Sequence, residues 1–117
     1  MPQLPTGVLY GVPALMAGQI VLGMAEQMPA AGGWPGFATG LLGTAGVMLM
    51  VFGARQIRPG WRLSTVFGSG GFLELIGEHF IDRVPGLAWL ALMAGVVLLT
   101  VGWLFAARDV WRLARPR

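Results

Sequence analysis

Residues 64–83 read STVFGSGGFLELIGEHFIDR, and the fold depends on whether this stretch crosses a membrane. Twenty residues form a helix of about 30 Å, which matches the hydrocarbon core of a bilayer. The acidic side chains oppose crossing, because an acid at mid-span costs about 2.5 to 3.5 kcal/mol on insertion scales. The stretch is therefore marginal alone and acceptable inside a bundle of helices.

The rest of the chain has the composition of an integral membrane protein. Of its 117 residues, 56% are hydrophobic and 11% are charged, whereas about a quarter of the residues of a soluble domain are charged. A soluble domain of this size could not bury so much apolar surface. We therefore expect one transmembrane domain over residues 1–117. Cysteine is absent, which removes disulfides and Cys-ligated metal sites.

Three apolar runs are long enough to span a membrane, at about residues 7–25, 36–54 and 85–107. The polar, turn-rich segment 26–36 predicts a connector between the first two runs. Residues 108–117 predict a short basic tail.

The arginines decide between three spans and four. If residues 64–83 stay on one side, the eight arginines divide four against four; if they cross, seven share one side and only Arg83 lies opposite. Cytoplasmic loops carry the excess of basic residues, so the second arrangement is favoured. We expect an all-α bundle of four transmembrane helices in a bacterial inner (plasma) membrane, with both termini cytoplasmic. Three spans plus an interfacial or re-entrant helix is the alternative. The residues predicted to set topology or contact lipid headgroups are Arg55, Arg58, Arg62, Arg108, Arg112 and Arg115.

These arginines do not indicate nucleic-acid binding. They flank apolar runs and form no continuous basic surface interleaved with aromatic residues. The predicted partners are the lipid bilayer and either partner subunits or further copies of the chain.

Acidic residues form one candidate site. On a helix, Glu74, Glu78 and Asp82 follow one another at intervals of four and share a face. Carboxylates inside a membrane usually face the bundle interior and indicate an ion or proton site. The alternatives are a solvated face of an interfacial helix and contacts to a partner's arginine. Gln19, the strongly polar residue of the first run, is a further candidate for a polar contact.

His79 is the one histidine of the chain. It could be a haem or metal ligand or a pH switch, but a boundary histidine satisfied by water or a carboxylate is the simpler interpretation. Glu78 and His79 are adjacent and point about 100° apart, so they lack the Glu-x-x-His spacing of di-iron bundles. We predict no metal site, while binding of haem, pigment or lipid stays open.

Small residues recur at intervals of four, a spacing that lets membrane helices approach closely. Because glycine makes up 19 of 117 residues, each pair is weak evidence, and together they favour tight packing. The pairs are Gly7/Gly11, Gly36/Gly40 and Ala91/Gly95.

No self-sufficient set of catalytic residues is present, so an enzyme is not the expected function. We expect a structural or accessory subunit of a larger membrane complex. One alternative is a homo-oligomeric transporter or an ion or proton conduit that uses Glu74. Another is a cofactor-binding redox subunit that uses His79.

Overall fold

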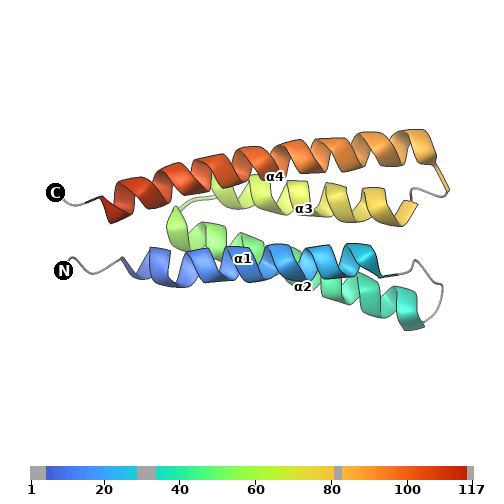
Figure 1. Ribbon diagram of the computed structural model, residues 1–117, viewed down its shortest axis with the longest axis horizontal. Helices are drawn as coiled ribbons and strands as arrows, with labels where there is room; N and C mark the ends of the chain where they lie inside the picture. Colours follow the sequence, from blue (N-terminus) through green and yellow to red (C-terminus); the bar gives the residue numbers. More distant parts are fainter. Residues whose placement is uncertain (1–4, 29–33, 81–82, 116–117) are drawn as a thin grey trace.

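The computed structural model describes residues 5–28, 34–80 and 83–115, and within these ranges the chain forms four helices that run alternately up and down (Figure 1). The start of α1 and the end of α4 lie at the same end of the bundle as the connection between α2 and α3 (Figure 1). The molecule measures 53 × 26 × 20 Å. The helices are α1 (Thr6–Gln27), α2 (Trp34–Ile57), α3 (Arg62–Phe80) and α4 (Pro85–Ala114).

In the described part of the chain, three helical segments are long and apolar enough to cross a membrane. They are Thr6–Gln27, Ala38–Ile57 and Pro85–Ala114. The helix α3 is shorter, at 19 residues, and its apolar positions are interrupted by Ser, Gly and Glu. The prediction of an all-helical fold is confirmed, and three candidate spans suggest a multi-pass membrane protein.

The helices extend beyond the apolar runs that predicted them. The connector expected at residues 26–36 is wrong at both ends, because α1 includes Glu26 and Gln27 and α2 begins at Trp34. Apolar composition marks the membrane core, whereas Glu and Gln favour a helix on either side of it. Likewise, α4 continues into the predicted basic tail as far as Ala114.

Proline defines the C-terminal ends of α1 and α4. Met28 and Arg115 are extended, with ψ of 141° and 126°, and each precedes a proline in the sequence. The ring of a proline disfavours helical dihedral angles in the residue before it. Both helices therefore end directly before the X-Pro pair, beyond the apolar runs that predicted them.

The helices α1 and α2 form an antiparallel hairpin through glycines seven residues apart. An ideal Cβ on Gly18 would lie 2.6 Å from the carbonyl oxygen of Gly46, and one on Gly53 would lie 2.6 Å from that of Gly11. Seven residues are about two helical turns, so these glycines share one face of each helix. At these glycines the two backbones are in direct contact.

The helices α3 and α4 form a second hairpin on the same plan. An ideal Cβ on Gly95 would lie 2.7 Å from the carbonyl oxygen of Gly70, and one on Gly77 would lie 2.8 Å from that of Ala88. These small residues are again seven apart within each helix. Both hairpins are therefore held by close backbone contact.

The two hairpins join mainly where α2 packs against α3. An ideal Cβ on Gly43 would lie 2.5 Å from Cδ1 of Leu75, and one on Gly71 would lie 2.8 Å from Cγ2 of Val47. By contrast, α1 contacts α3 and α4 far less than it contacts α2. We call the boundary between α1 and the α3–α4 hairpin the α1 seam, and its contacts are sparse compared with those inside each hairpin and between α2 and α3.

Candidate functional site

A cluster of carboxyl groups lies at the end of the α1 seam that is remote from the chain termini. Glu26 lies in the last turn of α1, and Glu74 and Glu78 lie in the last two turns of α3. The carboxyl groups of Glu26 and Glu74 are close enough for a hydrogen bond, and Glu78 is near enough to repel Glu26. All three residues are half-buried. We call these three residues the carboxyl cluster.

A proton is needed to hold the closest two carboxyl groups together. A carboxylate only accepts hydrogen bonds, so a bond between two carboxyl groups requires a proton on one of them. Without the proton, two negative charges would face one another inside the bundle. Oε1 of Glu26 is buried and has no hydrogen-bond partner in the described part of the chain. The pair is therefore a candidate site for one shared proton.

His79 lies beside the carboxyl cluster in the sequence and has one free ring nitrogen. Its Nδ1 lies 2.9 Å from the carbonyl oxygen of Leu75. A carbonyl oxygen only accepts, so Nδ1 carries the hydrogen and Nε2 has the lone pair. That Nε2 is buried and makes no hydrogen bond to any described residue.

A second polar contact crosses the α1 seam deeper in the bundle. Nε1 of Trp103 on α4 donates a hydrogen bond of 3.0 Å to Oε1 of Gln19 on α1. The Trp103 ring meets Phe67 of α3 edge to face, with centroids 5.6 Å apart and planes at 86°. Gln19 lies seven residues before Glu26, a rise of about 10 Å along α1. The seam thus carries polar groups at two depths.

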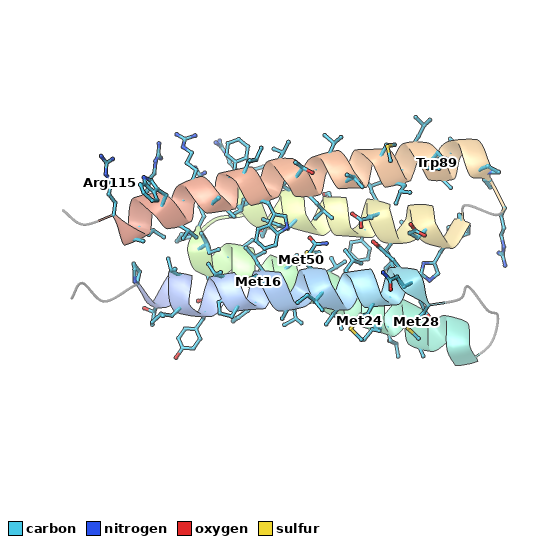
Figure 2. All side chains as sticks on the ribbon, in the orientation of Figure 1. Met16, Met24, Met28, Met50, Trp89 and Arg115 are labelled. Atoms are coloured by element: carbon cyan, nitrogen blue, oxygen red, sulfur yellow. The ribbon has the colours of Figure 1, made fainter. Side chains whose placement is uncertain are left out.

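The opposite end of the bundle is basic. Nη1 of Arg58 lies 3.7 Å from Oδ2 of Asp109, an ion pair between α2 and α4 whose side chains are 50% and 13% exposed. Trp61 and Trp111 are both 71% exposed at this end, as suits the interface of a membrane. Figure 2 shows Arg115 here, with Met28 and Trp89 towards the other end. The exposed arginines of this end are Arg55, Arg58, Arg62, Arg108, Arg112 and Arg115.

The structure describes the positions of most of the polar residues that the sequence analysis gave as site candidates. Glu74 and Glu78 belong to the carboxyl cluster, His79 follows it, and Gln19 binds Trp103. Asp82 lies outside the described residues. Arg83 is exposed at the end of the bundle opposite the other described arginines.

The predicted packing residues lie in different surroundings. An ideal Cβ on Gly11 would lie 2.8 Å from the carbonyl oxygen of Gly53, and that of Gly7 would collide with the backbone of Gln56. A Cβ on Gly95 would meet the backbone of α3, whereas one on Gly40 would meet nothing within 4 Å. Gly36 lies in α2, and Ala91 is half-buried on α4.

Sequence reasoning missed Glu26, Trp103 and Asp109. Glu26 was assigned to a connector because the apolar run ends at Ala25. Its signal was the interval of seven from Gln19, which puts both polar residues on one face of α1. In the part of the chain that is described, no three His, Cys, Asp or Glu residues are placed to hold a metal ion.

The comparisons with known proteins give no relative. No protein-family model, curated protein or solved structure matches this chain. The fold and the site define its class by themselves. This is a small all-helical protein, suggested by its apolar helices to be a multi-pass membrane protein, with carboxyl groups gathered between two glycine-packed hairpins.

Proposed function

We propose that this protein is a four-span membrane protein that binds and releases a proton at Glu26 and Glu74, as a proton conduit or a proton-coupled transporter. The observation that carries this proposal is the approach of the two carboxyl groups between α1 and α3. Acidic side chains are costly in a membrane and are usually retained there for a function. Glu78, nearer the end of α3, would form the entrance to the pair.

The arrangement of charge supports four spans. Every described arginine except Arg83 lies at the end that holds the start of α1 and the end of α4. The positive-inside rule would place this basic end in the cytoplasm and the carboxyl cluster towards the outer face. The helix α3 would cross because α2 and α4 cover much of it, including the fully buried Phe67. This reasoning favours a bacterial inner membrane with both termini cytoplasmic.

Infrared spectroscopy tests proton binding directly. We expect a band from a protonated carboxylic acid in the purified protein, lost on raising the pH. The variants Glu26→Gln and Glu74→Gln should each remove most of this band, because each deletes one member of the pair. The matched control is Asp109→Asn, which alters a carboxyl group at the basic end and should leave the band unchanged.

Proton flux in liposomes tests the functional step. We expect the protein to dissipate a pH gradient, and Glu26→Gln or Glu74→Gln to slow this at least about tenfold, as removal of an essential proton acceptor does. Glu78→Gln should only alter the rate, since Glu78 lies at the entrance. Unchanged flux in both Glu26→Gln and Glu74→Gln would overturn the proposal.

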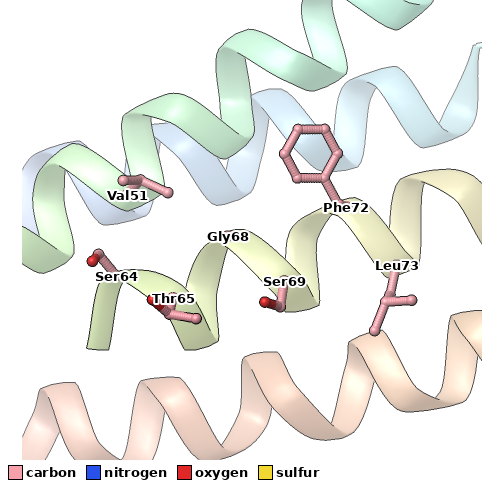
Figure 3. A pocket seen from close by; sticks show the side chains of 7 residues that line it. All are labelled: Val51, Ser64, Thr65, Gly68, Ser69, Phe72 and Leu73. Carbon is pink, nitrogen blue, oxygen red and sulfur yellow. The ribbon is translucent and has the colours of Figure 1, made fainter. Parts of the chain in front are cut away.

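A second candidate function is that of an accessory subunit in a larger membrane complex. Its support is a groove of about 660 Å³ on the exposed face of α3 next to α2 (Figure 3). Membrane helices associate through faces of this kind, which are rich in Gly, Ser and Thr. A transmembrane helix of a partner subunit would fit there. The groove is lined by Val51, Ser64, Thr65, Gly68, Ser69, Phe72 and Leu73.

Purification from native membranes in mild detergent tests this second candidate. We expect a partner to copurify with the wild-type chain and to be lost in Ser69→Leu, which fills the groove. The control Ala94→Leu adds the same bulk at an exposed position of α4 and should retain the partner. A chain that purifies only as a free monomer removes the accessory role.

A further inference from the structure

We propose that the hydrogen bond between Gln19 and Trp103 is a gate, which closes the α1 seam between the carboxyl cluster and the basic end and opens when the two hairpins move apart. This inference rests on the proposed proton site, since the gate controls the route inward from it. The argument starts from which parts of the bundle can move.

Each hairpin is built to move as one body. At Gly18 and Gly46 the backbones of α1 and α2 approach directly, and at Gly95 the backbone of α4 approaches that of α3, so these close contacts leave little room for the helices of one hairpin to slide. Between the hairpins, by contrast, side chains of α2 and α3 interdigitate, and α1 has few contacts with α3 or α4. The movement with least resistance therefore pivots at the α2–α3 contact and opens the α1 seam.

The seam is sealed at the depth of Gln19. Leu15 and Leu22, one turn away on either side, are fully buried, as is Phe67. Trp103 closes the remaining space by packing its ring on Phe67 and donating to Gln19. An indole N–H inside an apolar bundle needs an acceptor, and Gln19 is the acceptor across the seam. Among the polar contacts of the described residues, this one hydrogen bond crosses the seam at this depth, and it can be broken reversibly.

The carboxyl cluster would bias the gate. A proton shared by Glu26 and Glu74 ties α1 to α3 and favours the closed seam. When the proton leaves, the two carboxylates repel and favour separation of the same helices. The charged groups that act on Glu26 are Glu74 and Glu78, both on α3, and no charged group of the described parts of α2 and α4 offsets them. His79, also on α3, has an Nε2 without a hydrogen-bond partner among the described residues.

The absence of cysteine makes the gate measurable by thiol labelling. The reporter is Val12→Cys, because Val12 is half-buried on α1 and precedes Gln19 by two turns on the same face, towards the basic end. In intact cells, a membrane-impermeant maleimide reaches the chain only from the outer face. We expect slow labelling of the reporter alone and at least tenfold faster labelling when Gln19→Ala or Trp103→Phe is added, since each removes the hydrogen bond. The control Gln27→Ala, which truncates an exposed glutamine of the same helix, should leave the rate unchanged.

The outcomes separate the gate from the proton site. If Gln19→Ala and Trp103→Phe leave the labelling rate at the reporter's own value, the gate is wrong even when the infrared band still depends on Glu26. If they accelerate labelling while Glu26→Gln leaves the infrared band intact, the gate stands and the proton site falls. The coupling between the carboxyl cluster and the gate is tested with the Val12→Cys reporter alone. Its labelling rate should rise with external pH, and adding Glu26→Gln should abolish that rise. If the labelling rate of the Val12→Cys reporter alone does not depend on pH, the coupling between the carboxyl cluster and the gate is wrong.

Discussion

At the scale of single residues, Gly60 is a position where the backbone dihedral angle, and not the room for a side chain, decides the cost of a substitution. It lies between α2 and α3 with φ of +112°, a region that residues with a Cβ rarely adopt. Nothing lies within 4 Å of an added Cβ, so an alanine there would meet backbone strain and no collision. We expect Gly60→Ala to lower the free energy of unfolding by about 1 to 3 kcal/mol.

The control for Gly60 is the same substitution at Gly23. An added Cβ also meets nothing there, but Gly23 is inside α1 with helical dihedral angles. Alanine favours a helix over glycine by about 1 kcal/mol. Gly23→Ala should therefore stabilise the chain, and thermal unfolding in detergent should show opposite signs for the two variants. Equal effects would mean that φ is not the deciding factor.

At Glu26, a substitution that stabilises the fold should remove the proposed function. Above the pH at which the shared proton leaves, Glu26 and Glu74 repel, so Glu26→Gln should stabilise the fold by on the order of 1 kcal/mol. At low pH the shared proton removes the repulsion, and the stabilisation should disappear. Unfolding measured against pH checks this expectation. A double-mutant cycle with Glu74→Gln should show coupling between the two residues, and additive effects would contradict their contact.

At the scale of helices, contact between glycine backbones holds each hairpin together. A Cβ on Gly18 would lie 2.6 Å from a backbone oxygen of Gly46, so the two helices must separate to admit it. Gly18→Ala should destabilise the chain by about 1 to 3 kcal/mol, as overpacking does. Gly40→Ala, on α2 with open space, is the control and should be neutral or stabilising. Equal unfolding temperatures for the two variants would contradict this account of the hairpin.

The sequence predicts the helices better than it predicts what lies between them. Apolar runs locate α1, α2 and α4, because composition and length suffice to recognise a long apolar helix, whereas residues 64–83 were assigned to a helix from the distribution of arginines. The end of the apolar run wrongly placed Glu26 in a connector. The helix α1 continues past that run and ends at Gln27, because the residue after Met28 is a proline. Of the small residues at intervals of four, Gly7 and Gly11 contact α2, whereas Gly40 has open space, and further backbone contacts recur at intervals of seven. The choice of helix face depends on the partner helix, and a single sequence does not specify it.

At the scale of the whole molecule, the two hairpins repeat one plan. Their small residues recur at the same interval, and in the first helix of each hairpin an acid directly follows the last of them, as Glu26 follows Ala25 on α1 and Glu78 follows Gly77 on α3. The helices α1 and α3 run in the same direction, so the repeats are parallel (Figure 1). Parallel repeats related by an axis along the membrane normal occur in transporters, which place their sites at the repeat interface. The carboxyl cluster lies between the first helices of the two hairpins, the position that the proposed function would use.

The distribution of charge along the bundle gives the prediction on which the membrane topology depends. Two single-cysteine variants, Gln27→Cys at the acidic end and Leu113→Cys at the basic end, both alter exposed residues. With four spans these ends lie on opposite faces, so an impermeant maleimide applied to intact cells should label Gln27→Cys and spare Leu113→Cys. Lysis should then expose Leu113→Cys. If α3 does not cross, α4 carries Leu113 to the outer face, and both variants would be labelled in intact cells. The positive-inside rule favours the first result, because it keeps the six described arginines of the basic end in the cytoplasm.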